Sequence, residues 1–154
     1  DEFIIGSCGT VNIGQTIEML LKPLPISGED LYIYMVTKFT PALRELMKNR
    51  GGEIKTQNGN EEMDARVLVG IRGRLFMIDG GYGVIEPAHK FAAVGCADQE
   101  ALAAMFTVSQ LHPESSAERM VTYGLLAAAE FDLAIRPPFS FISSKETNLA
   151  LAVA

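Results

Sequence analysis

Residues 65–86, ARVLVGIRGRLFMIDGGYGVIE, constrain the fold of this chain more than any other stretch. Two runs rich in β-branched and other apolar residues flank Arg72 and Gly73, a pair typical of a tight two-residue turn. A second turn at residues 80–83 precedes a third short run. The segment therefore predicts an antiparallel meander of three strands.

Helical patterns dominate the chain before this meander. An apolar run at residues 3–5 ends at Gly6 and predicts a buried strand, which a helix follows. A loop at residues 22–30 supplies capping residues for a second helix. That helix is predicted over residues 31–50, with Pro41 as a point where it kinks or splits. Residues 51–64 are rich in Gly, Asn and acidic side chains and predict an exposed loop.

More helix follows the meander. Residues 91–94 predict a strand and residues 98–110 a helix. Ser115 and Glu118 have the spacing of a capping box at the start of another helix. The C-terminal segment predicts strands interrupted by a Pro-Pro pair. This order of helices, antiparallel strands, helices and strands predicts an α+β sandwich with helices outside and sheets within.

Composition limits the classes of function. A length of 154 residues predicts one domain. The formal net charge of -6 would repel phosphate backbones and anionic lipids, so nucleic acid and membrane surfaces are not expected partners. The apolar runs are far shorter than the roughly 20 residues that cross a bilayer, and no signal peptide is recognisable. We therefore expect a cytoplasmic protein.

The cysteines and acidic residues indicate neither a metal site nor a cofactor. Cys8 and Cys96 fit no metal or redox motif and are too few for a disulfide scaffold. Asp79, Glu86 and the acidic residues of residues 59–64 do not have the spacing of a calcium loop. The GGYG turn lacks the Lys-Ser/Thr of a phosphate-binding loop.

Four segments in a fixed order carry a resemblance to a known family. They are IIGSCGT before a helix, LVGIRGRLFMIDGGYGVIEP as the meander, FAAVGCADQEALAAM leading into a helix, and AAAEFDLAIRPPFSF near the end. Their order and spacing resemble the proteasome β-type and HslV-type peptidases, in particular the bacterial and phage forms. The resemblance spans residues 3–142. It implies a four-layer αββα sandwich, the fold of N-terminal nucleophile hydrolases.

The same resemblance implies an activity and a missing part. Members of the family cleave peptide bonds with an N-terminal threonine whose own amine helps to move protons. Asp1 aligns downstream of that threonine and of the first two strands. We therefore expect residues 1–154 to form a single proteasome-like domain that is N-terminally incomplete. The mean hydropathy of +0.17 is high for one domain and agrees with apolar surface that a missing segment or a partner subunit covers.

Candidate site residues follow from the resemblance. The backbone N–H of Gly9 would face the developing oxyanion, where the lack of a side chain lets a substrate carbonyl approach. Ser7, Cys8, Gly9, Thr10 and Val11 would pair with an extended substrate and line its first side-chain pocket. From the residues alone, Gly6 and Gly9 equally fit a tight turn between strand and helix.

Two further candidates have open alternatives. Cys96 stands where the family commonly has a serine in the proton network, and a thiol is a weaker hydrogen-bonding group. It could instead be an inert buried residue, or a nucleophile activated at a helix N-terminus. Neither His89 nor His112 lies in a partner motif for it. Asp132 matches an acidic residue that supports the amine of the threonine, and it equally fits a capping or turn residue.

Two classes of function remain open. The first is a threonine-type endopeptidase subunit in its full-length form, with the nucleophile upstream of Asp1. The second is a non-catalytic shell or scaffold subunit of the same fold. For either, the resemblance implies a homo-oligomeric ring, and for the peptidase it implies peptide or unfolded-protein substrates and an ATP-dependent unfoldase as a partner. A third hypothesis, a cysteine-dependent amidohydrolase, uses Cys96 as the nucleophile.

Overall fold

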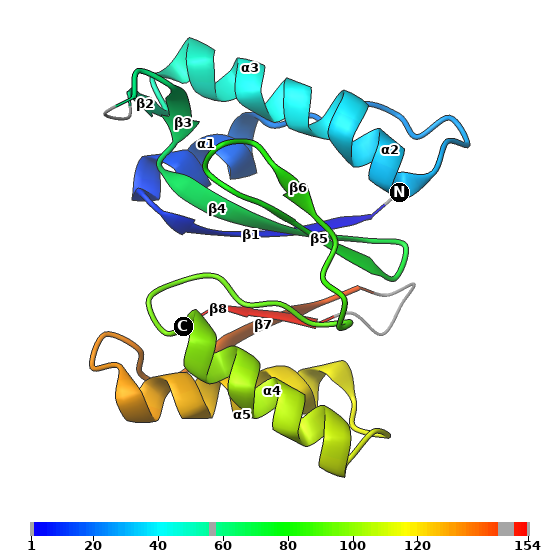
Figure 1. Cartoon of the computed structure of the whole chain (residues 1–154), viewed down its shortest axis with the longest axis vertical. Helices are drawn as coiled ribbons and strands as arrows, with labels where there is room; N and C mark the ends of the chain where they lie inside the picture. Colours follow the sequence, from blue (N-terminus) through cyan, green and yellow to red (C-terminus); the bar gives the residue numbers. More distant parts are fainter. Residues whose placement is uncertain (1, 56–57, 145–149, 154) are drawn as a thin grey trace. The chain divides into compact units, whose positions relative to one another are not determined.

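The computed structural model describes residues 2–55, 58–144 and 150–153 (Figure 1). It contains a four-stranded sheet in the order β1-β4-β5-β6 and two-stranded sheets formed by β2 with β3 and by β7 with β8. The strands are β1 (Phe3–Gly9), β2 (Glu53–Lys55), β3 (Glu61–Met63), β4 (Ala65–Ile71), β5 (Arg74–Ile78), β6 (Val84–Ile85), β7 (Ser140–Ser143) and β8 (Ala150–Val153). The helices are α1 (Val11–Leu20), α2 (Leu31–Tyr34), the π-helical η1 (Met35–Phe39), α3 (Thr40–Arg50), α4 (Asp98–Leu111) and α5 (Ala117–Phe131).

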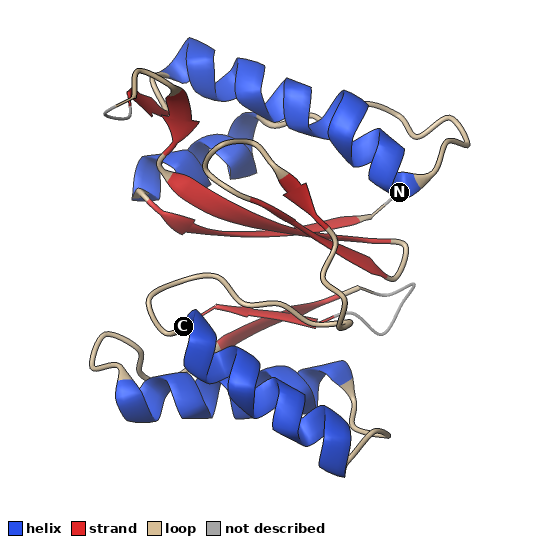
Figure 2. Cartoon of the chain, viewed as in Figure 1, coloured by secondary structure: helices blue, strands red, loops and turns tan. Residues whose placement is uncertain are grey.

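Helices and strands both contribute substantially, which confirms the α+β class (Figure 2). The chain divides into two compact units. The first unit consists of residues 7–67 and 76–86, and the second of residues 1–6, 68–75 and 87–154.

The meander forms as the sequence predicts. Arg72 and Gly73 both have positive φ, 45° and 76°, and join β4 to β5. Such a turn matches the right-handed twist of the paired strands. Strand β5 then pairs antiparallel with β6, with Met77 opposite Ile85. At the turn between them, Gly83 N donates to Asp79 Oδ1 at 2.7 Å.

The predicted helix over residues 31–50 forms, and Pro41 marks its irregularity. Asp30 caps α2, because its Oδ1 accepts hydrogen bonds from Tyr32 N at 2.8 Å and Ile33 N at 3.3 Å. The π-helical turn η1 ends at Phe39, two residues before Pro41, whose ring and missing N–H disfavour regular α-helical bonding over the preceding turn. The buried face of the segment carries apolar residues at helical spacing, namely Leu31, Met35, Phe39, Leu43 and Met47.

Helix α1 follows the first strand, as predicted, and buries Ile13 and Ile17, which are four residues apart. Its apolar residues Val11 and Leu20 are 74% and 41% exposed. Helix α1 packs against α3. Gly52, just after α3, leaves room for Met47, since a Cβ on Gly52 would lie 2.8 Å from Met47 Sδ.

Residues 51–64 are not simply an exposed loop. They contain the antiparallel pair β2 and β3, in which Glu53 lies opposite Met63. Met63 is buried and its N–H donates to Gly80 O at 2.8 Å. Polar composition concealed this hairpin, because a strand with one solvated face needs few apolar residues.

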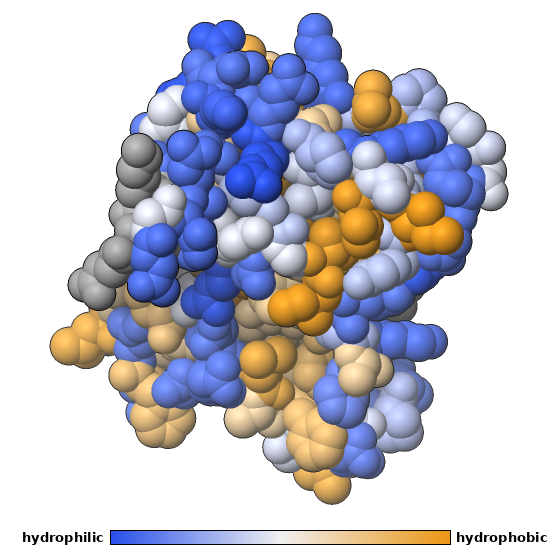
Figure 3. Space-filling model, turned by 45° about the horizontal axis from the view of Figure 1, so that its top comes forward, coloured by the Kyte–Doolittle hydropathy of each residue, from blue (hydrophilic) through white to orange (hydrophobic). Residues whose placement is uncertain are grey.

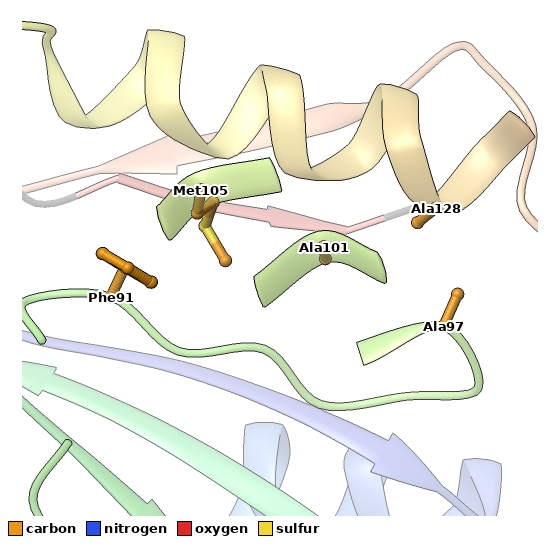
Figure 4. Packing of buried hydrophobic residues seen from close by; sticks show 5 residues of the cluster. All are labelled: Phe91, Ala97, Ala101, Met105 and Ala128. Atoms are coloured by element: carbon orange, nitrogen blue, oxygen red, sulfur yellow. The ribbon is translucent and has the colours of Figure 1, made fainter. Parts of the chain in front are cut away.

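In the second unit, α4 and α5 pack closely because small residues meet between them. A Cβ on Gly124 would lie 3.1 Å from Met105 Cγ and 3.3 Å from the carbonyl oxygen of Ala101. The core cluster consists of Phe91, Ala97, Ala101, Met105 and Ala128 (Figure 4). The alanine-rich helices are thus used for packing within the chain.

Three local predictions in this unit need correction. Residues 91–94 are irregular and not a strand, since the apolar Phe91 serves the core cluster. The N-cap of α5 is Ser116, whose Oγ accepts from Arg119 N at 3.2 Å, and not Ser115. Residues 133–139 form no strand before the cis Pro137–Pro138 bond, and β7 begins only after it.

Large apolar side chains are exposed on both units. Figure 3 shows orange residues among the predominantly blue surface on one face of the molecule. The exposed apolar side chains of the whole surface include Met19, Leu24, Ile33 and Val36 in the first unit and Phe106, Leu111, Leu126, Phe131 and Leu133 in the second. Within the described part of the chain, no helix has both the length and the apolar character needed to cross a membrane.

Candidate functional site at the junction of β1 and α1

The predicted substrate-binding residues lie together at one junction of the first unit. Ser7, Cys8 and Gly9 end β1, Thr10 is the N-cap residue of α1, and Val11 begins that helix. Cys8 is half-buried and the other four are exposed. Because β1 is at the end of the order β1-β4-β5-β6, it is an edge strand of this sheet among the residues that the structure describes. An edge strand has backbone groups on one side that an extended peptide can pair with.

Gly9 is required by the backbone around it. Its φ is +123°, a conformation that residues with a side chain rarely adopt. A Cβ at this position would overlap the carbonyl oxygen of Asp64 and lie 2.7 Å from Ala65 Cα. The close approach of β4 therefore explains this glycine without any substrate. Its predicted role as oxyanion donor remains a prediction.

Asp64 is a residue of this junction that sequence reasoning missed. The backbone N–H of Thr10 donates to Asp64 O at 3.1 Å, and Thr10 Oγ1 donates to Asp64 Oδ2 at 2.5 Å. Asp64 is exposed and directly precedes β4. It stood in the segment predicted to be a loop, and no pattern in the sequence links it to a residue 54 positions away.

Gly14 is a second contributor to the junction. A Cβ on Gly14 would lie 3.0 Å from Ser7 Oγ, so this glycine leaves room for the serine side chain beside α1. A glycine within a predicted helix is the only sequence signal for such a close approach.

Cys96 lies at another junction, in the second unit. It is exposed, which contradicts the predicted burial of this residue, whereas its reactivity stays untested. Gly95 before it has φ +134°, and Ala97 after it is the N-cap residue of α4. The first turn of α4 carries Asp98 and Glu100. This acidic setting differs from the electropositive surroundings in which reactive cysteines usually occur. The roles of helper and nucleophile stay predictions.

Asp132 ends α5 and organises the turn after it. Its Oδ1 accepts a hydrogen bond from Ala134 N at 2.8 Å, and its carbonyl oxygen accepts from Ile135 N at 3.2 Å and Arg136 Nη1 at 2.8 Å. This is the turn role that the sequence allowed. Support for an N-terminal amine remains a prediction.

The two histidines lie in the second unit near α4. His89 stacks on Phe91, with the ring centroids 5.3 Å apart, and meets Phe106 edge to face. His112 is the C-cap residue of α4, with Nδ1 4.0 Å from Glu114 Oε1. Both are exposed.

Displaced pKa values fall on groups of the first unit outside the predicted site. Burial raises the pKa of Tyr82, and the hydrogen bond from its hydroxyl to Glu53 Oε1, 2.8 Å long, adds to this. Burial also raises the pKa of Tyr34. The hydrogen bond from Lys38 lowers the pKa of Glu29. These groups stabilise structure, since Tyr82 and Glu53 join the β5–β6 turn to β2.

Potential metal ligands do not cluster in the described ranges. Nowhere among residues 2–55, 58–144 and 150–153 do three His, Cys, Asp or Glu side chains come together in a way that could hold a metal ion.

Comparison with known proteins gives the fold. No protein-family model and no curated protein matches the sequence. Among solved structures, BPH from Thiobacillus denitrificans, a bacterial proteasome homologue, is similar with a TM-score of 0.67 and 21% identity. The match covers 88% of this chain and 71% of BPH. The chain has a proteasome-like fold.

Two further structures agree with this assignment. BPH in complex with epoxomicin gives a TM-score of 0.66 at 21% identity, with 88% of this chain and 71% of BPH covered. The eukaryotic HslV from Trypanosoma brucei gives 0.54 at 20% identity, with 88% and 72% covered. The predicted resemblance to proteasome and HslV subunits is therefore confirmed at the level of the proteasome-like fold.

Proposed function

We propose that the full-length protein is a threonine-type endopeptidase subunit, with its nucleophilic threonine upstream of Asp1. The observation that carries this proposal is the match over 88% of the chain to the structures of BPH and HslV. The covered share of BPH is 71%, which leaves room in that fold for the segment that would hold the nucleophile. In this proposal, residues 1–154 are one proteasome-like domain without its N-terminal part.

The junction of β1 and α1 supplies the substrate-binding part of the proposal. Its exposed residues lie at the end of an edge strand, where an extended peptide can add antiparallel. The N–H of Gly9 then stabilises the oxyanion, a contribution worth about 3–4 kcal/mol in enzymes where one such donor has been removed. Ser7 to Val11 pair with the substrate and line its first pocket.

Cys96 and Asp132 have supporting roles in this proposal. The Cys96 thiol is a weak donor in the proton network, and the Asp132 carboxylate supports the amine of the threonine. Asp132 Oδ1 already accepts from Ala134 N, so its second oxygen is the atom proposed to face the amine. Asp132→Asn retains the turn acceptor and changes the charge, so it separates the two roles of this residue.

A second function, that of a non-catalytic shell subunit, is favoured by a specific observation. The chain has structural needs for Gly9 and Asp132 that involve no substrate: one avoids an overlap with Asp64, and the other organises the turn after α5. A scaffold that kept the fold would keep both residues for these reasons alone.

The deciding experiment is the intact mass and N-terminal sequence of the protein from its native source. A mature chain that begins with threonine upstream of Asp1 supports the peptidase. A mature chain that starts at Asp1 overturns it in favour of the shell subunit. Epoxomicin, present in one of the BPH structures, is a suitable probe: we expect it to bind the full-length protein and not a Thr→Ala variant at the mature N-terminus.

The proposed partners follow from the peptidase function. We propose a homo-oligomeric ring in the cytoplasm that takes peptide or unfolded-protein substrates and works with an ATP-dependent unfoldase. Light scattering coupled to size-exclusion chromatography measures the assembly. A full-length protein that stays monomeric at micromolar concentration contradicts the ring.

A further inference from the structure

Thr10 uses its hydroxyl in an unusual way for a residue that caps a helix. A threonine at the N-cap normally accepts a hydrogen bond from a backbone N–H in the first turn, which stabilises the helix by about 1 kcal/mol. The side chain of Thr10 makes no such bond to α1. It donates to the carboxylate of Asp64 instead. By contrast, the N-cap residues Asp30 and Ser116 do cap their helices.

Asp64 holds Thr10 at two atoms. Its main-chain oxygen accepts from the Thr10 N–H at 3.1 Å while its side chain accepts from the Thr10 hydroxyl. Fixing the backbone and the side chain of one residue leaves that residue little freedom to rotate. The Gly9–Thr10 peptide group is therefore held from its C-terminal side by a residue distant in the sequence.

The same residue limits Gly9 directly. The Asp64 carbonyl oxygen and Ala65 Cα occupy the space where a Gly9 side chain would lie. Gly9 is thus packed against the start of β4 on one side and tied through Thr10 on the other. The N–H that is proposed to bind a substrate carbonyl belongs to Gly9, in the preceding Cys8–Gly9 peptide group, so both constraints reach it through the backbone angles of Gly9.

We propose that Asp64 is a positioning residue that sets the orientation of the Gly9–Thr10 backbone for peptide substrates. The inference rests on the proposed function, since it assigns a task to the same junction. An ionised carboxylate only accepts hydrogen bonds and cannot donate one to an oxyanion, so Asp64 acts through Thr10. Displacements of about 1 Å in such an arrangement reduce rates by roughly 100-fold.

The test compares Asp64→Ala with the wild type in the full-length protein by two readouts. Peptide hydrolysis should show kcat reduced roughly 10- to 100-fold with KM changed by less than about threefold, because substrate groups away from Gly9 still bind. Amide hydrogen exchange should be faster at residues 9–13 and needs no activity. Thr10→Val keeps the shape of the side chain and removes the hydroxyl, so it should show the same loss of kcat and the same faster exchange. Thr10→Ser retains the hydroxyl and should have kcat and exchange rates close to those of the wild type.

Asp30→Ala is the matched control. It removes another carboxylate that accepts from two groups in the same unit, away from the junction. We expect it to lower Tm while exchange at residues 9–13 and kcat of the folded protein stay unchanged. A kcat loss in Asp30→Ala equal to that in Asp64→Ala would mean that general destabilisation explains both, and would overturn the proposal.

The two proposals fail in distinguishable ways. If the full-length wild type has no peptidase activity, the proposed function is wrong, and hydrogen exchange still decides whether Asp64 positions the junction. Faster exchange at residues 9–13 in Asp64→Ala and Thr10→Val, with no further increase in the double variant, supports the coupling. Unchanged exchange in both variants overturns it, whatever the activity.

Discussion

Gly9 and Gly95 both have positive φ and both stand shortly before a helix, but for different reasons. Gly9 (φ +123°) precedes Thr10 and α1, whereas Gly95 (φ +134°) precedes Cys96, Ala97 and α4. A Cβ on Gly9 would overlap the backbone of Asp64, but a Cβ on Gly95 would have no atom within 4 Å. Position 9 therefore needs glycine both because a side chain would not fit and because of its backbone conformation. Position 95 needs glycine for its backbone conformation alone.

The residues that follow these two glycines also differ in the contacts that they make. Thr10 is tied to Asp64 through its backbone and its hydroxyl. Cys96 is exposed, and the first turn of α4 has its own carboxylates in Asp98 and Glu100, which favour a helix N-terminus. The first junction is therefore held by hydrogen bonds to a residue 54 positions away, whereas the second carries carboxylates in the first turn of its own helix.

The largest effect is expected for Gly9→Ala. The added methyl group meets backbone that cannot rotate away and also imposes an unfavourable φ, so the free energy of unfolding should fall by more than about 3 kcal/mol. Chemical denaturation followed by circular dichroism measures this. A loss below about 1 kcal/mol would contradict the close approach of Asp64.

Gly95→Ala should have a smaller effect, about 1–3 kcal/mol, because it imposes the unfavourable φ in open space. The same denaturation measurement applies. The comparison between the junctions breaks down if this variant is as destabilised as Gly9→Ala.

Thr10→Val should lower stability by about 1 kcal/mol, the usual value of one hydrogen bond, since Asp64 loses its side-chain partner. Thr10→Ser retains the hydroxyl and serves as the control. Thermal unfolding of the two variants is measured under identical conditions. Equal Tm values for both would show that the Thr10 hydroxyl contributes nothing to stability.

Cys96→Ala should have the smallest effect, within about 0.5 kcal/mol, as for other exposed positions. In the peptidase proposal it lowers the activity without abolishing it, because the thiol is a weak donor in the proton network and not the nucleophile. Complete inactivation by Cys96→Ala would favour the cysteine-dependent amidohydrolase in place of a threonine peptidase.

Elements with a strong local pattern could be predicted from the sequence. The meander followed from β-rich runs around Arg72 and Gly73, and the segment over residues 31–50 followed from apolar residues at helical spacing. The hairpin in residues 51–64 could not be predicted, because its polar strands resemble a loop. The strand predicted at residues 91–94 was wrong, since the apolar character of Phe91 reflects its burial in a core.

For the candidate site, the sequence by itself determined the order of a strand, a glycine, a threonine and the start of a helix. Only the tertiary structure decided that Gly9 has no room for a side chain and that Thr10 binds Asp64. The physical reason is the distance along the sequence over which each interaction acts. Turns and helices are specified by residues a few positions apart, whereas steric exclusion and hydrogen bonds across 54 positions exist only once β4 lies beside β1.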